Sequence, residues 1–254
     1  MGKSKNTIID PLIIRDYYNE EIRVTKYIDT RFYRPLGKYQ HEVQVRYVNT
    51  IIRKYNIKNI LEIACGPARI TKEIHSFVKG YAIDYSDKML DYAKSRVNNK
   101  HWIFLKKDAF ALDLNPEFEL VYTFRFLRHF KRQERGKLYF NIRKVLKNSG
   151  LLIFDAICIK KPEIIQQLES KGEKDRLYDK IYKNKNELMD ELSQNGFILV
   201  ETIDYIKLFY IQAIISRLSY VLHHEKLGYN IIKKLDKLPF GKPLEWIVLC
   251  QKKG

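Results

Sequence analysis

Two carboxylates and one glycine stand at spacings that suit the binding of a nucleoside. Gly66 lies in the stretch EIACGPA, which begins at Glu62, and Asp84 follows Glu62 by 84 − 62 = 22 residues. Glycine and its small neighbours let a ligand approach the backbone closely. A carboxylate about 20 residues after such a turn can take both hydroxyls of a ribose. The pattern therefore predicts a nucleoside-binding site.

Two common phosphate-binding motifs do not fit this stretch. The three glycine positions of G-x-G-x-x-G would hold Ala64, Gly66 and Arg69. The third glycine of that motif lets helix and strand pack closely, and an arginine there is a poor steric fit. The phosphate loop G-x-x-x-x-G-K-[ST] is also absent from the sequence. The sequence therefore does not predict a dinucleotide site of the first type or a nucleoside triphosphate site of the second type.

The hydrophobic pattern places these residues at the ends of short strands. Apolar runs at 59–65, 80–86, 101–109, 118–126 and 151–159 predict buried strands. Helical spacing predicts helices at 68–78, 86–97 and 132–146, the last ended by Asn148-Ser149-Gly150. Strands that alternate with helices of this length predict βαβ units and a parallel sheet. Two helical stretches after Lys160 and strands within 196–210 and 243–252 complete the pattern.

Taken together, the motifs resemble those of the class I S-adenosylmethionine-dependent methyltransferases. EIACGPA is similar to their glycine-rich first motif, with alanine at two positions often held by glycine, and DYSDKML and KKDAFAL are similar to the second and third. The resemblance covers about residues 59–157. It implies an α/β, Rossmann-like fold with a mostly parallel seven-stranded sheet and helices on both faces. Residues 1–55 would form an N-terminal helical cap and 56–254 the methyltransferase domain, with a helical insertion at about 209–240 before the last strand.

The resemblance also implies which residues hold the cofactor, S-adenosyl-L-methionine. The implied cofactor-binding residues are Glu62, Ala64, Gly66, Asp84, Tyr85, Met89, Asp108, Ala109 and Phe124. Gly66 and the backbone around Ala64 would face the methionine part, and Glu62 would support their loop. The residues just past the fourth predicted strand, Phe124 to Phe126, would line the methyl-donor side.

The nucleoside part of the cofactor is implied to lie further along the strand ends. Asp84 would bind the ribose hydroxyls, Tyr85 and Met89 would pack near the adenine, and Asp108 with the backbone of Ala109 would take the adenine amino group. Both carboxylates also have a plain structural interpretation. Asp84 could be a charge at a helix N-terminus, although Ser86 is the better cap. Asp108 could simply begin a turn.

The segment YTFRFLRHF, after the fourth predicted strand, is where an acceptor would be expected. Methyltransferases of exocyclic base nitrogens resemble one another in a [DN]-P-P-[YF] tetrapeptide, which is absent here. Arginine binds carboxylate or phosphate through two donors, and histidine can act as a general base near neutral pH. Arg125 and His129 are therefore the candidate catalytic residues. Alternatively, His129 packs against the next helix, and Arg125 and Arg128 are solvated.

Two flanking regions could cover the site. In the N-terminal region Tyr17, Tyr18, Arg31, Tyr33 and Arg34 are candidates to reach inward. Between residues 209 and 240 the apolar positions share one broad face. That face predicts packing against the sheet, a lid over an apolar acceptor, or contact with a membrane surface helped by basic neighbours.

Composition narrows the partners and the compartment. The formal charge is +17, but the lysines are scattered, which favours solvated basic faces over a nucleic-acid site. A signal peptide and a run of about 20 apolar residues are not visible in the sequence. Three cysteines far apart suggest neither disulfides nor a zinc site, and no metal site is predicted. A cytoplasmic protein is expected.

The combined evidence predicts an S-adenosylmethionine-dependent methyltransferase. The expected acceptor is a small molecule or a lipid- or glycan-linked group, with oxygen as the favoured atom. An RNA methyltransferase that uses the basic surface is one alternative. A cofactor-binding module without catalytic activity is another. The sequence does not decide the oligomeric state.

Overall fold

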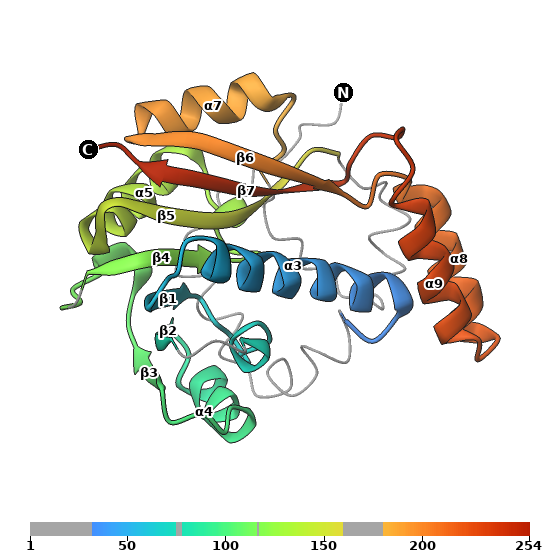
Figure 1. Ribbon diagram of the computed structural model, residues 1–254, viewed down its shortest axis with the longest axis horizontal. Helices are drawn as coiled ribbons and strands as arrows, with labels where there is room; N and C mark the ends of the chain where they lie inside the picture. Colours follow the sequence, from blue (N-terminus) through green and yellow to red (C-terminus); the bar gives the residue numbers. More distant parts are fainter. Residues whose placement is uncertain (1–31, 75–77, 116, 160–179) are drawn as a thin grey trace, which may run out of the picture.

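The structure, a computed structural model, describes residues 32–74, 78–115, 117–159 and 180–254. In these residues a seven-stranded sheet has the order β3-β2-β1-β4-β5-β7-β6 (Figure 1). Strands β1 to β5 are parallel, and β7 runs antiparallel between β5 and β6. The strands are β1 (Asn59–Ile63), β2 (Lys79–Asp84), β3 (Trp102–Lys106), β4 (Phe118–Thr123), β5 (Leu146–Ile157), β6 (Phe197–Tyr205) and β7 (Glu245–Lys252). The predicted fold class is confirmed.

Helices cover both faces of this sheet, as predicted. The helices of the described residues are α3 (Pro35–Lys54), α4 (Asp87–Arg96), α5 (Arg132–Val145), α7 (Lys185–Gln194), α8 (Phe209–Val221) and α9 (Glu225–Leu235). Val48 and Ile51 of α3 share one core with Ile60 of β1. Leu138 of α5 and Leu188 of α7 lie in the core on the opposite face. The central strands are buried on both faces, which explains their nearly continuous apolar sequences.

Two helical regions flank the sheet strands in the sequence: α3 before β1, and α8 with α9 between β6 and β7. Helix α3 starts at Pro35, because proline suits the first position of a helix. Helices α8 and α9 form the predicted insertion between β6 and β7. Strand β6 runs in the same direction as β1 to β5, since both it and β5 are antiparallel to β7. The insertion therefore follows the carboxyl edge of the sheet.

Two local predictions are wrong. The helix expected at 68–78 is, over its described part, a turn followed by the short 3₁₀ helix η1 (Thr71–Glu73). Ala68 has a φ of +54° there, and a left-handed residue cannot continue an α-helix. Helix α5 ends at Val145 rather than at Asn148-Ser149-Gly150, because that stretch already belongs to β5.

Some predictions fall outside the described residues. Tyr17, Tyr18 and Arg31 lie in the segment 1–31, and one of the two helical stretches expected after Lys160 falls largely within 160–179. Of the helices in the described ranges, none combines the length and apolar character that crossing a bilayer requires.

Candidate active site

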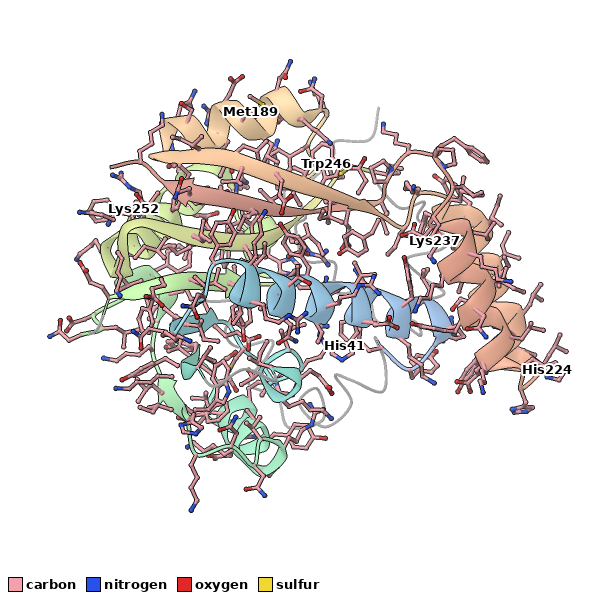
Figure 2. All side chains as sticks on the ribbon, in the orientation of Figure 1. His41, Met189, His224, Lys237, Trp246 and Lys252 are labelled. Carbon is pink, nitrogen blue, oxygen red and sulfur yellow. The ribbon has the colours of Figure 1, made fainter. Side chains whose placement is uncertain are left out.

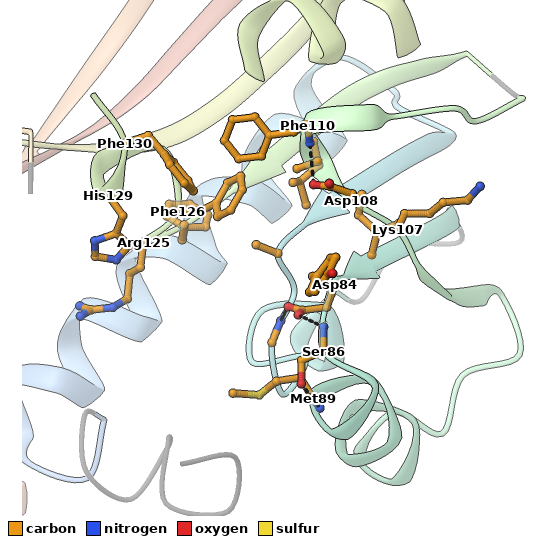
Figure 3. Close-up of a pocket in the computed structure, with 17 residues that line it drawn as sticks. Asp84, Ser86, Met89, Lys107, Asp108, Phe110, Arg125, Phe126, His129 and Phe130 are labelled. Atoms are coloured by element: carbon orange, nitrogen blue, oxygen red, sulfur yellow. Dashed lines mark hydrogen bonds between the residues drawn. The ribbon is translucent and has the colours of Figure 1, made fainter. Parts of the chain in front are cut away.

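A cavity opens at the carboxyl ends of β1, β2, β3 and β4 (Figure 3). It encloses about 820 Å³ of empty space, part of it open to solvent. Ligand sites of α/β sheets form where the strand order reverses, and here that point lies between β1 and β4. The wall consists of Ile63, Ala64, Gly66, Ile83, Asp84, Tyr85, Ser86, Met89, Lys107, Asp108, Ala109, Phe110, Phe124, Arg125, Phe126, His129 and Phe130. All the predicted site residues except Glu62 are among them.

The loop after β1 is held open by its backbone conformation. Ala64, Gly66 and Ala68 have φ values of +55°, +51° and +54°. Left-handed conformations cost an alanine about 1–2 kcal/mol more than a glycine. A Cβ added to Gly66 would meet none of the described atoms within 4 Å. The glycine thus borders open space in the cavity, and its contact with the methionine part of the cofactor stays a prediction.

Asp84 joins this loop to the end of β2. Its carboxylate accepts hydrogen bonds from the backbone N–H of Gly66 at 2.8 Å and of Ser86 at 2.9 Å. A carboxylate has about four lone-pair sites, so Asp84 can still accept a hydroxyl group of a ligand. Burial raises the pKa of Asp84, and hydrogen bonds from the backbone of Ser86, Gly66 and Tyr85 oppose that rise. Asp84 therefore has a structural role and keeps acceptor capacity for a ribose.

Ser86, Met89 and Asp108 confirm the local structure expected of the second and third motifs. The hydroxyl of Ser86 accepts a hydrogen bond from the backbone N–H of Met89 at 3.2 Å and caps α4. The carboxylate of Asp108 accepts from the backbone N–H of Phe110 at 2.9 Å, at the start of the 3₁₀ helix η2 (Ala109–Ala111). Asp108 does begin a turn, and it also lines the cavity. Its contact with adenine stays a prediction.

Glu62 lies beneath the loop rather than in the cavity wall. Its carboxylate accepts hydrogen bonds from the hydroxyl groups of Thr71 and Tyr122, the latter at 3.0 Å. Burial raises the pKa of Glu62 to about 7, although both hydrogen bonds oppose the rise. This position agrees with support of the loop, and a direct cofactor contact stays a prediction.

Arg125 and His129 stand across the cavity from Asp84 (Figure 3). Arg125 has a φ of +59°, and its backbone N–H donates to Asp155 Oδ1 at 2.5 Å. His129 lies in the 3₁₀ helix η3 (Leu127–His129) and is buried. The two side chains share one wall of the cavity, so both could contact an acceptor. Their catalytic roles stay predictions.

Arg128, between these two residues, is neither solvated nor directed at the cavity. Its guanidinium lies 3.1 Å from Asp155 and 3.0 Å from Glu245, and all three side chains are buried. Glu245 also accepts hydrogen bonds from Gln40 and Tyr205, each at 2.7 Å. This buried network fixes the loop after β4 and joins it to β5, β7 and α3.

Phe110 and Phe130 line the cavity but were not predicted from the sequence, whereas Phe126 belongs to the predicted segment 124–126. Phe110 and Phe126 each pack edge-on against Phe130, with ring centroids 5.1 and 5.0 Å apart. Their rings make one wall apolar. The only sequence feature that could have indicated this apolar wall was the spacing of Phe126 and Phe130 just after a strand end.

A second missed contact links α3 to the loop after β1. Nδ1 of His41 lies 2.7 Å from Arg69 Nη1, and Gln44 accepts from Arg69 Nη2 at 2.6 Å (His41 is labelled in Figure 2). Burial and the charge of Arg69 lower the pKa of His41 to about 3. His41 is therefore neutral, and its Nδ1 accepts the bond because arginine can only donate. These hydrogen bonds to His41 and Gln44 explain how the loop accommodates a buried arginine at position 69.

Comparison with known proteins places this site within a recognised domain. Residues 60–150 match a family model described as a methyltransferase domain. The matched segment begins in β1, ends in β5 and contains every cavity residue. Residues 60–150 are therefore similar to a known methyltransferase domain.

Two curated relatives are similar to part of this chain. Malonyl-[acyl-carrier protein] O-methyltransferase of Bacillus anthracis is 29% identical over 116 residues, which are 42% of this chain and 41% of that protein. Nodulation protein S of Azorhizobium caulinodans is 27% identical over 107 residues, which are 39% of this chain and 51% of that protein. The chain therefore spans about half or less of the length of the curated relatives it matches.

The fold of this chain is also found in solved structures. Magnesium protoporphyrin IX methyltransferase from Synechocystis PCC 6803, with bound SAH, superposes with a TM-score of 0.61 at 14% identity. The superposition covers 95% of this chain and 99% of that one. At this identity the likeness establishes the fold alone.

Proposed function

We propose that the protein is an S-adenosylmethionine-dependent methyltransferase. The observation that carries the proposal is the convergence of Gly66, Asp84 and Asp108 on one cavity inside the segment that matches the methyltransferase model. The open backbone at Gly66 suits the methionine part of the cofactor. Asp84 and Asp108 offer acceptors to the ribose hydroxyls and the adenine amino group. The similar solved structure of magnesium protoporphyrin IX methyltransferase contains bound SAH, which supports the same cofactor class.

When bound, S-adenosylmethionine supplies an activated methyl group, so the protein mainly orients the two reactants. Gly66 and Asp84 hold the cofactor side. The rings of Phe126 and Phe130 exclude water from the opposite wall. His129 accepts the proton that the acceptor releases, and Arg125 binds an anionic group of the acceptor.

The proposed acceptor is a small molecule, or a lipid- or glycan-linked group, methylated at oxygen. A hydroxyl group must lose its proton during transfer, which gives His129 a function in the cavity wall. One curated relative is named an O-methyltransferase, which supports oxygen as the acceptor atom. RNA is less favoured, since the basic residues are scattered along the sequence.

The test uses the full chain and S-adenosylmethionine labelled in its methyl group. Small-molecule, lipid, glycan and RNA fractions of a cell extract are offered separately. We expect label in one of the first three fractions, and loss of that label with Asp84→Asn. Label confined to RNA would make the acceptor class wrong. Cofactor binding without transfer to any fraction would favour a non-catalytic module.

The roles of Arg125 and His129 are tested separately from cofactor binding. His129→Asn should lower turnover by about a hundredfold, the usual contribution of a general base. Arg125→Gln should mainly raise the KM for an anionic acceptor. Neither variant should change the Kd for the cofactor, because both residues lie across the cavity from Asp84. Unchanged kinetics in both variants would remove them from the reaction.

A further inference from the structure

Helix α8 turns its apolar side outward. Ile211, Ile214 and Leu218 are 52%, 59% and 56% exposed, and Val221 and Leu222 continue the same helical stripe at 63% and 61%. We call these five residues the outer apolar face. The buried positions of the same helix are Phe209, Gln212, Ser216 and Ser219. An amphipathic helix of a globular protein normally has the opposite arrangement.

Specific contacts keep the polar side of α8 inward. Ser216 Oγ accepts a hydrogen bond from the backbone N–H of Leu36 at 3.0 Å, and Gln212 donates to the carbonyl of Ile232 at 3.3 Å. Ser219 packs closely against Gly228 of α9, because a Cβ added to Gly228 would lie only 2.0 Å from the Oγ of Ser219. Rotation of α8 to bury its apolar residues would break these contacts. The outer apolar face is therefore a fixed feature of the insertion.

The insertion as a whole carries a positive formal charge. Residues 207–243 contain seven lysines and arginines and two carboxylates, a formal charge of +5. Both carboxylates are engaged, since Glu225 pairs with Lys38 at 2.6 Å and Asp236 accepts from the hydroxyl of Tyr39 at 2.7 Å. Arg217, on α8, and Lys226, at the start of α9, are exposed. Figure 2 labels His224 at the turn between the helices and Lys237 at the other end of α9.

We propose that the outer apolar face docks on the surface of an anionic lipid membrane. An apolar helix face bordered by lysine and arginine suits the interface of a bilayer, where apolar side chains enter the acyl boundary and cations meet anionic headgroups. Charge complementarity favours lipid over a second copy of the chain, because two insertions of charge +5 would repel each other. The proposal concerns peripheral binding and does not depend on methyl transfer.

The test is sedimentation of the full chain with vesicles, without cofactor or acceptor. One set contains phosphatidylcholine alone, and the other contains equal parts of phosphatidylcholine and phosphatidylglycerol. We expect binding to the anionic vesicles, weaker binding to the neutral ones, and loss of the difference at high salt. Absence of binding to either set would overturn the proposal.

Surface variants identify the face that binds. Ile214→Ser with Leu218→Ser should weaken binding to anionic vesicles about tenfold or more, and Arg217→Gln with Lys226→Gln should weaken it severalfold. The matched control is Phe140→Ser with Lys137→Gln on α5, where Phe140 is 61% exposed. These positions are exposed, so every variant should fold, which thermal unfolding checks.

Two results with these variants would contradict the proposal. Equal vesicle binding by wild type and the Ile214→Ser, Leu218→Ser variant would place the membrane contact elsewhere. A wild-type dimer that the same variant converts to monomers would make the outer apolar face a self-interface. Sedimentation equilibrium distinguishes the second result.

Discussion

The two sides of the cavity are built differently. On the cofactor side, carboxylates fix the loops after β1, β2 and β3 by accepting hydrogen bonds from backbone N–H groups. Donor and acceptor in each of these bonds are 18 residues or fewer apart in the sequence. On the acceptor side, the loop after β4 depends on buried side chains. Arg128 reaches Glu245, 117 residues away, and Gln40 reaches Glu245 over 205 residues. Local backbone geometry thus defines one side and long-range packing defines the other.

The largest effect on stability is expected on the acceptor side. Arg128→Leu leaves Asp155 and Glu245 buried without their cation, which should lower the free energy of unfolding by about 3–5 kcal/mol. Arg132→Leu is the control, since the exposed Arg132 bonds only to Gln194 among the contacts of the described residues. Arg132→Leu should change the free energy of unfolding by no more than about 0.5 kcal/mol. Denaturant unfolding measures both, and a small loss for Arg128→Leu would contradict the comparison.

A pH-dependent effect is expected beneath the cofactor loop. Glu62 has a folded-state pKa of about 7 against an ordinary value of 4.5, so the folded protein holds this proton more tightly than the unfolded chain. The stability that Glu62 contributes is present below pH 4.5 and is lost as the pH rises to about 7. Glu62→Gln keeps an acceptor for Thr71 and Tyr122 without the charge.

Glu62→Gln should therefore be more stable than wild type above pH 7, by up to about 3 kcal/mol, with little difference below pH 4.5. Denaturant unfolding across this pH range measures the difference. Glu73→Gln, at a partly exposed position of η1, is the control and should show no such trend. A constant difference between Glu62→Gln and wild type at all pH values would contradict the assignment of the titration to Glu62.

Substitution of Gly66 is expected to have the smallest effect on stability. Its effect on cofactor binding is expected to be large. Gly66→Ala should cost only about 1 kcal/mol of stability, because its positive φ is strained for alanine but its Cβ enters open space. The same methyl group would enter the cavity and weaken cofactor binding. Ala64→Gly is the opposite change and should stabilise the loop slightly. Tight cofactor binding by Gly66→Ala would show that the loop does not face the ligand.

The same comparison explains which features the sequence could predict. The strands and the positions of Gly66, Asp84 and Asp108 follow from a short-range pattern, so the sheet and the cofactor side were predictable. The turn at Ala68 was not, because helical spacing gives no sign that an alanine adopts a positive φ. Pairing of Arg128 with Asp155 and Glu245 was also hidden, since it brings together strands that only the complete sheet places side by side.

The orientation of the insertion was predictable only in part. Its apolar stripe was evident in the sequence, whereas the direction of that stripe depends on contacts of Ser216 and Gln212 with α3 and α9. Small polar residues that pack closely carry no distinct signal in a single sequence. A pattern of apolar residues defines a face, and tertiary contacts decide where it points.

The central claim is that the cavity at Gly66 and Asp84 binds the nucleoside cofactor, and calorimetric titration of the full chain with S-adenosylhomocysteine tests it most directly. The account predicts one site per chain. Affinity should fall about 10- to 100-fold in Asp84→Asn, since hydrogen bonds to a charged group are lost. Asp91→Asn, an exposed position on α4, should leave it unchanged. No binding by the wild type, or equal affinity in Asp84→Asn, would contradict the account.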